Sequence, residues 1–370
     1  MPVQNDVIEA KNTLSRELLF NDTPMLTEDT LIVASAAESP MGNVHAVGVG
    51  HKIVDGSEKK CVDIYVVKKL DLSVLAASAV LPTEVNGVPT NVIESPPAFF
   101  SASAKTANTA SKFSKVSNAK VSKATTEEIV TAAGLACTDN RQRRQRPAMA
   151  GISAGHFRST AGTISCFCRS TRTGDNPNEI YVLSNNHVFA EVNRGMPGDA
   201  LLQPGRLDDG GPPDTFAQLS RFIPLRLGGG DENRVDAAIG RLIGGPLPHP
   251  EICSIGRIGG IGRATENMMV RKHGRTTGLT GGIVKDTHYD ARVGMDHNDP
   301  FSIARFVDQI RIEVIAPFPA IGLGGDSGSL VFHGSQQQAV GLYFAGPLNG
   351  EYGIANHIDA VLSELAIQLI

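Results

Sequence analysis

From residue 147 to the C-terminus, short apolar runs alternate with stretches rich in Gly, Pro, Asn and Asp. Regularly interrupted runs of this kind are typical of strands in an antiparallel barrel or sandwich, and they disfavour an α/β sheet. The pattern predicts a mainly β region of two small packed antiparallel barrels, closed by a helix over Ile358–Leu369. The predicted strands are Ile164–Arg169, Ile180–Ser184, Ala237–Leu242, Met268–Lys272, Ile283–Lys285, Phe306–Val314, Leu330–Phe332 and Ala339–Phe344.

The N-terminal segment shows a helical spacing of apolar residues instead. This spacing predicts an amphipathic helix over Asp6–Phe20, with Asn5 or Asp6 available as the N-cap. We expect its apolar face to dock on the chain itself, and docking on another subunit of a homo-oligomer is the alternative. The apolar stripe consists of Val7, Ile8, Leu14, Leu18 and Leu19.

The next segment combines strand and turn signals. Two β-branched runs, Ala46–Val54 and Cys61–Lys68, flank an Asp-Gly-Ser turn and predict a strand pair. A short helix is expected over Leu72–Leu81, and Val85–Ile93 carries another turn at Asn-Gly. We therefore predict a small α+β N-terminal module over residues 44–96, preceded by the helix and an extension in residues 1–43.

Residues 97–146 change composition to Ser, Ala, Thr, Asn and Lys, which predicts a linker between the module and the β region. The linker ends in a run with four arginines, Arg141–Arg146. Three interpretations of this run are open: a solvated domain boundary, a processing site cut after arginine, and a contact with an anionic partner. Nucleic-acid binding through residues 105–146 is the least favoured, because few aromatic residues accompany the lysines.

The composition narrows the class of protein. With 370 residues and 41% apolar residues, the chain can bury a sizeable core. A formal net charge of -4 gives no general electrostatic case for nucleic acid. No stretch approaches the ~18 consecutive apolar residues of a membrane span. The N-terminus carries charges where an export signal would carry an apolar run.

The five cysteines are an odd number scattered along the chain, so we expect a cytoplasmic protein with reduced thiols. Cys166 and Cys168 share one face of a predicted strand, but no Cys or His pair with zinc-like spacing follows them. We expect these two cysteines to be buried and structural, and we predict no metal and no cofactor.

The candidate chemistry is concentrated in the Gly-rich turn Gly324–Leu330, which contains Ser327. A serine hydroxyl is a poor nucleophile at neutral pH unless a positioned base takes its proton. The glycines allow a sharp turn whose outward-facing amides can hold an oxyanion. The turn therefore requires a base elsewhere in the chain.

Only one histidine is well placed to be that base. His187 follows the apolar strand Ile180–Ser184, so its imidazole would lie at a strand end. The imidazole needs a buried acceptor, and Asp236 lies at the mouth of the apolar segment Val235–Ile239. The other candidate aspartates lie mainly in polar turns. His187, Asp236 and Ser327 are therefore the predicted base, orienting acid and nucleophile.

The chain from about residue 147 to 370 resembles the chymotrypsin-fold (trypsin-like) serine peptidases. Within that group it is similar to the cytoplasmic bacterial type and the plant NARROW LEAF type. The module Val44–Ser95 is also similar to one found in those bacterial proteins. The resemblance implies a double antiparallel β-barrel with a C-terminal helix, an endopeptidase activity on a protein or peptide substrate, and an oxyanion hole made by the amides of Gly325 and Ser327. The matching segments are Leu183–Val188, Gln203–Gly205, Val235–Ile239, Gly274–Thr280, Gly325–Ser329 and Gly341–Gly346.

The same resemblance implies a specificity pocket with Ile321 at its base and with Phe344, Ala345 and Gly346 along its wall. An apolar base predicts cleavage after an apolar or small residue. Two departures from secreted trypsins matter: no cysteine lies beside His187 or in the serine turn, and no Ile-Val-Gly-Gly start supplies a new N-terminus to Asp326. Asp326 must therefore have another partner. The alternative to an enzyme is a catalytically silent scaffold or binding protein that keeps the fold.

Overall fold

The computed structural model describes residues 4–31, 33–100, 141–296 and 299–370. The chain divides into two compact units, and each is treated by itself. The first contains Met1–Phe99, Arg226–Arg234 and Lys285–Ile310, and the second contains Phe100–Leu225, Val235–Val284 and Arg311–Ile370. The first unit therefore combines the N-terminal region with two segments from the predicted β region.

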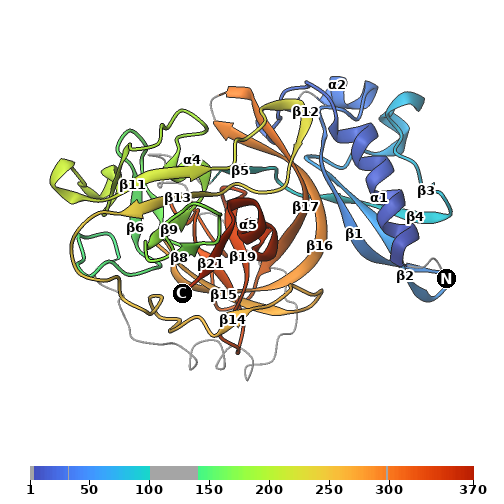
Figure 1. The fold of residues 1–370 in the computed structure, drawn as a ribbon. Coiled ribbons are helices and arrows are strands. Elements are labelled where there is room, and N and C mark those ends of the chain that lie inside the picture. The colour runs from blue at the N-terminus through green and yellow to red at the C-terminus, as the bar shows by residue number, and fades with distance from the viewer. Residues whose placement is uncertain (1–3, 32, 101–140, 297–298) are drawn as a thin grey trace. The chain divides into compact units, whose positions relative to one another are not determined.

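The first unit packs a long helix on a small sheet (Figure 1). Val7, Leu14, Leu18 and Leu19 of the predicted stripe are buried against valines and an isoleucine of the sheet, so the helix docks on its own chain. Ile8, the fifth predicted member, is only half-buried. Strands β3, β4, β2, β1 and β16 lie in that order, and the β2–β4 pair is parallel. The elements are α1 (Gln4–Leu19), α2 (Val33–Glu38), β1 (Val44–Val54), β2 (Ser57–Val66), η1 (Leu72–Val74), η2 (Ala77–Ala79), β3 (Glu84–Val85), β4 (Val88–Glu94), β12 (Gly228–Asn233) and parts of β5 (Ala98–Phe100), β16 (Gly278–Asp296) and β17 (Asp299–Val314).

The second unit is built on two groups of strands around one apolar core. In the first group the order is β21-β8-β9-β13-β11-β10-β6-β7, with every neighbouring pair antiparallel. Its strands are β6 (Ser153–His156), β7 (Gly162–Thr163), β8 (Cys166–Ser170), β9 (Tyr181–Ser184), β10 (Ala200–Leu202), β11 (Thr215–Phe222), β13 (Ala238–Leu242) and β21 (Ile367–Leu369). The short helices are α4 (Asn186–Phe189), η3 (Arg206–Asp208) and η4 (Pro212–Asp214).

In the second group, β20, β19, β18, β15 and β16 pair antiparallel in that order. Its strands are β14 (Gly260–Ile261), β15 (Met269–Gly274), β18 (Leu330–His333), β19 (Gln338–Gly346) and β20 (Tyr352–His357), followed by helix α5 (Ile358–Leu365). The predicted mainly β class is confirmed, with curled antiparallel sheets and few helices. Each predicted strand of this region overlaps an observed one, and four of the eight begin one or two residues before the observed strand does.

Three local predictions are wrong. The expected helix Leu72–Leu81 is two separate 3-10 turns, because Leu72 is 72% exposed and no apolar face holds a longer helix. The expected C-terminal helix stops early, because Ala366 has φ 48° and the next residues form β21 against β8. Ala98–Phe100, placed in the linker, is a buried strand whose first two residues pair with β16.

The rest of the predicted linker up to residue 140 lies outside the described residues. The arginine run at its end binds its own unit. Arg141 donates to the carbonyl oxygens of Arg275 and Thr276 at 3.0 and 3.2 Å, and Arg144 pairs with Asp214 at 3.0 Å. These contacts fit a domain boundary, and the processing-site and anionic-contact hypotheses stay predictions.

Candidate active site

His187 lies where an apolar strand ends. The strand β9 delivers the chain to Asn185, and the single-turn helix α4 begins immediately after it. All four residues of α4 are buried, and the His187 residue is only 7% exposed. The sequence predicts this imidazole at a strand end. In the structure His187 lies three residues beyond the end of β9, within the single turn of α4.

Asp236 lies immediately beside this histidine. Its carboxylate accepts the His187 backbone N–H at 3.2 Å and contacts the imidazole Nδ1 at 2.5 Å. Asp236 is fully buried, so this imidazole is a principal partner of its charge. The structure therefore brings together the two residues that the sequence paired across 49 positions.

Two asparagines fix the backbone of Asp236. The Asn185 amide donates to the Asp236 carbonyl oxygen at 2.7 Å, and the Asn356 side-chain oxygen accepts the Asp236 N–H at 3.0 Å. Both asparagines are fully buried. Sequence reasoning missed Asn356. The signal that could have found it is a polar residue directly after the apolar residues that begin the strand Tyr352–His357.

Ser327 lies on a turn that only glycine can make. Gly325 and Gly328 have φ of 98° and 96°, in the left-handed region. A Cβ on Gly328 would lie 2.2 Å from the Thr163 carbonyl oxygen. Within the described residues, neither the Gly325 N–H nor the Ser327 N–H donates to another group. Both amides are therefore available to an oxyanion.

Ser327 and His187, the predicted nucleophile and base, are not hydrogen-bonded to each other. The Ser327 hydroxyl donates to the Phe344 carbonyl oxygen at 3.0 Å. The Nε2 atom of His187 is buried and has no hydrogen-bond partner among the residues described. A hydrogen bond between these two side chains would therefore require the serine side chain to rotate away from the Phe344 carbonyl.

Lys272 is the partner that Asp326 needed. Its Nζ lies 3.2 Å from the Asp326 carboxylate, and both side chains are fully buried. Burial by itself would raise the pKa of Asp326, but the Lys272 ammonium and hydrogen bonds from Leu323 and Thr277 outweigh it and hold that pKa below its usual value. The acid that follows Gly325 is therefore ionised and held by a cation from β15.

Thr163 and Arg275 brace the other side of the turn. The Thr163 hydroxyl donates to the Gly325 carbonyl at 2.9 Å, and its N–H donates to the Ser327 carbonyl at 2.8 Å. Arg275 forms a buried ion pair with Asp208 and donates its N–H to the Thr163 hydroxyl at 3.0 Å. The turn is thus held by hydrogen bonds and ion pairs, and sequence reasoning had not identified Thr163 or Asp208.

The residues predicted to form a specificity pocket are all buried. Ile321 is 1% exposed, and Phe344, Ala345 and Gly346 are buried on β19. A Cβ on Gly353 would meet the Tyr343 ring at 2.5 Å and Ile321 at 3.1 Å, so these two side chains converge on one glycine. The environment of Ile321 is therefore apolar and aromatic, and its role in specificity stays a prediction.

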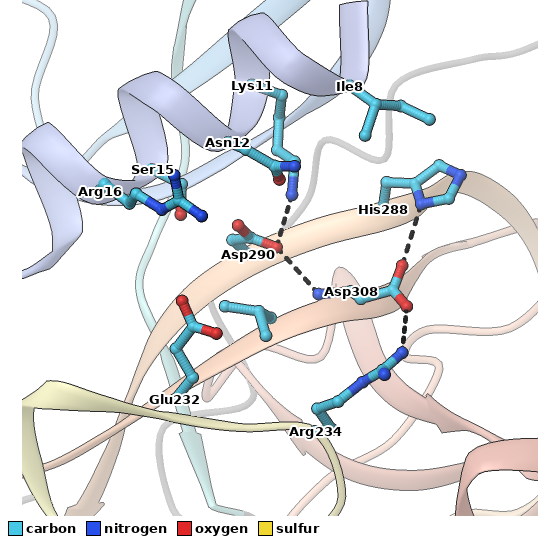
Figure 2. A pocket seen from close by; sticks show the side chains of 11 residues that line it. Ile8, Lys11, Asn12, Ser15, Arg16, Glu232, Arg234, His288, Asp290 and Asp308 are labelled. Carbon is cyan, nitrogen blue, oxygen red and sulfur yellow. Dashed lines mark hydrogen bonds and ion pairs between the residues drawn. The ribbon is translucent and has the colours of Figure 1, made fainter. Parts of the chain in front are cut away.

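The first unit contains a hollow of about 260 Å³, lined by α1, β16 and β17 together with Glu232 and Arg234 (Figure 2). Lys11 pairs with Asp290 at 2.8 Å in the buried wall. Asp308 contacts both His288, at 2.9 Å, and Arg234, at 2.8 Å. These charges largely compensate one another, so the hollow indicates no ligand of a particular charge.

The cysteines correct one expectation. Cys61, Cys166 and Cys168 are free and buried, and burial raises the pKa of Cys166 to about 12. The pair Cys166 and Cys168 is therefore structural and unreactive, as predicted. Cys253, however, is disulfide-bonded, so the expectation that all thiols are reduced is wrong. In the part of the chain that the structure describes, no helix is long and apolar enough to cross a membrane.

Comparison with known proteins gives a likeness of fold. No protein-family model matches the chain, and no curated protein matches it. The chain is similar to the crystal structures of Thermobifida fusca protease A (18% identity, TM-score 0.42, 60% of this chain and 97% of that one) and of Cellulomonas bogoriensis chymotrypsin (16%, 0.41, 60% and 98%). It is also similar to a glutamic-acid-specific serine protease (18%, 0.42, 60% and 100%). A likeness of this size says nothing about the role of any residue.

Proposed function

We propose that the protein is a serine endopeptidase that hydrolyses peptide bonds through His187, Asp236 and Ser327. The observation that carries the proposal is the buried carboxylate of Asp236, bound to the Nδ1 and the N–H of His187. A carboxylate in that position fixes the imidazole tautomer and stabilises the imidazolium that forms during attack. The Ser327 turn supports the proposal with two amides available to an oxyanion.

The proposed reaction starts with rotation of the Ser327 hydroxyl from the Phe344 carbonyl toward Nε2 of His187. His187 takes the proton as Oγ attacks the peptide carbonyl, and the amides of Gly325 and Ser327 hold the oxyanion. His187 then protonates the leaving amine, which gives an acyl-enzyme on Ser327. Water, deprotonated by His187, releases the acid and restores the hydroxyl.

A fluorophosphonate probe tests this mechanism directly, because it reacts with an activated serine. We expect wild-type protein to be labelled and Ser327→Ala to lose both labelling and peptide hydrolysis, by about 10⁶-fold in turnover. Asp236→Asn should lower turnover by roughly 10⁴-fold, because the imidazole is then held in the wrong tautomer. Unchanged hydrolysis in Ser327→Ala would reject the mechanism.

We further propose cleavage after an apolar or small residue, because Ile321 supplies no carboxylate for a lysine or arginine side chain. Its buried position against Tyr343 and Gly353 supports this proposal. A peptide-library profile of the wild-type protein would measure the preference. Strong preference for cleavage after arginine contradicts the assignment of Ile321.

A catalytically silent scaffold is the second candidate function. The hydrogen bond from Ser327 to Phe344, together with the unpartnered Nε2 of His187, favours it. A scaffold predicts that folded wild-type protein resists the probe, and that Ser327→Ala binds partners as well as the wild type does. Labelling that is lost in Ser327→Ala excludes this function.

The finer classification is also a proposal. The resemblance of the sequence to the cytoplasmic bacterial and NARROW LEAF type peptidases supports an intracellular protein substrate. The disulfide at Cys253 argues for an oxidising compartment instead, since disulfides are rare in the cytosol. Fractionation of cells that produce the protein, with thiol alkylation before lysis, measures both the compartment and the state of Cys253.

A further inference from the structure

The candidate base carries an aromatic cover from its own chain. The ring of Phe100 is stacked on the imidazole of His187, with 4.5 Å between the ring centroids and 9° between the ring planes. The same ring meets Phe344 edge-on, with 6.2 Å between the centroids and 65° between the planes. Phe100 is 4% exposed, so this is a closed contact within the second unit.

The contact involves the groups that a substrate must reach. In this conformation Ser327 has no exposed surface and His187 has 7%. The backbone carbonyl of Phe344 accepts the serine hydroxyl, and the side chain of Phe344 contacts Phe100. A substrate carbonyl can approach Ser327 only after some part of this arrangement has moved.

Phe100 belongs to the same chain as His187, so it can compete with a substrate for the space beside the imidazole. It is the last residue of β5, and its ring contacts Phe344 on β19. A group that belongs to the same chain acts at a high effective concentration, so one aromatic contact can compete with a substrate.

We propose that Phe100 is an autoinhibitory residue, which covers the face of His187 and must be displaced before a substrate reaches Ser327. This inference rests on the proposed peptidase function. It predicts that removing the ring opens the site, whereas a purely structural role predicts that removing the ring damages it. The two roles therefore change reactivity in opposite directions.

The test measures the second-order rate of fluorophosphonate labelling of the full chain. We expect Phe100→Ala to label about tenfold faster than wild type, with Phe100→Leu between them, because leucine keeps an apolar contact but not the flat stack. Labelling of the wild type should be independent of protein concentration, since the block is intramolecular. The matched control is Phe301→Ala, which removes a 66% exposed phenylalanine and should leave the rate unchanged.

The outcomes separate the inference from the proposed function. Labelling of folded Phe100→Ala or Phe100→Leu that is equal to or slower than wild type overturns the autoinhibitory role and leaves the peptidase in place. If Phe100→Ala does not fold, the rate of Phe100→Leu decides by the same criterion. An absence of labelling in the folded wild type and in both variants overturns the peptidase function, and the inference with it.

Discussion

Replacing Lys272 by methionine should destabilise the turn that carries Ser327, because Asp326 in that turn loses its buried countercharge. The substitution keeps most of the side-chain volume and removes the ammonium 3.2 Å from the Asp326 carboxylate. Asp326 then keeps four donors: the N–H groups of Thr276 (2.8 Å), Thr277 (3.1 Å) and Leu323 (2.9 Å) and the Thr277 hydroxyl (2.8 Å). It loses its buried countercharge.

Breaking a buried ion pair by removing one partner costs about 3–5 kcal/mol. Four hydrogen bonds to Asp326 remain in the variant. We therefore expect a loss of about 3 kcal/mol in the free energy of unfolding, at the lower end of that range. Labelling of Ser327 should also slow by about 10²-fold or more, since the amides on either side of Asp326 lose their orientation.

Chemical denaturation and probe labelling of Lys272→Met, Asp326→Asn and the double variant check this prediction. The double variant removes both charges of this pair and leaves neither one unpaired, so its loss should be smaller than the sum of the two single losses by at least about 1 kcal/mol. Lys68→Met is the control, because it breaks the exposed pair with Glu94 and should change stability little. Additive losses, or a Lys272→Met variant as stable as wild type, would refute the reasoning.

The remaining predictions concern one glycine and two buried titratable groups. Gly328→Ala should cost several kcal/mol of unfolding free energy, since its Cβ would lie 2.2 Å from the Thr163 carbonyl oxygen, whereas Gly174→Ala, with a similar φ of 94° and open space around it, should cost about 1–2 kcal/mol by denaturation. Equal losses would contradict the clash. Burial lowers the pKa of His273 to about 4, so the protein should lose about 3 kcal/mol as the pH falls from 6.5 to 4, and His273→Gln should flatten that limb of the pH–stability curve. Burial raises the pKa of Asp286 to about 6, so this group destabilises the first unit as the pH rises from about 4 to 6, by about 3 kcal/mol, and Asp286→Asn should remove that dependence. Unaltered pH–stability curves in these variants would show that the two groups titrate alike in the folded and unfolded chain.

The strands and the His187–Asp236 pair could be predicted because both depend on local signals. An apolar run that ends in small polar residues marks a strand end, and an aspartate at the mouth of such a run is forced into a buried position. The mainly β class could be predicted because stretches rich in Gly, Pro, Asn and Asp interrupt the apolar runs at regular intervals. Such features are properties of short segments, so no knowledge of distant contacts was needed.

The supports of the site could not be predicted in the same way. Lys272 appeared only as the last residue of a predicted strand, and nothing local shows that its ammonium meets Asp326 more than fifty residues later. Phe100 falls in the predicted linker because the segment that runs on to about Thr126 is rich in Ser, Ala, Thr, Asn and Lys, yet its ring is buried by contacts with His187 and Phe344. These contacts depend on tertiary packing, which overrides the composition of the surrounding segment.

The Lys272–Asp326 pair has a consequence for how activity can be controlled. Both residues belong to the same unit, so the ion pair forms whenever that unit folds, and no separate covalent event is needed to supply the cation. We therefore expect the serine turn to be ordered in every folded copy of this unit. Regulation of the proposed peptidase would then act on access to the serine or on the amount of folded protein.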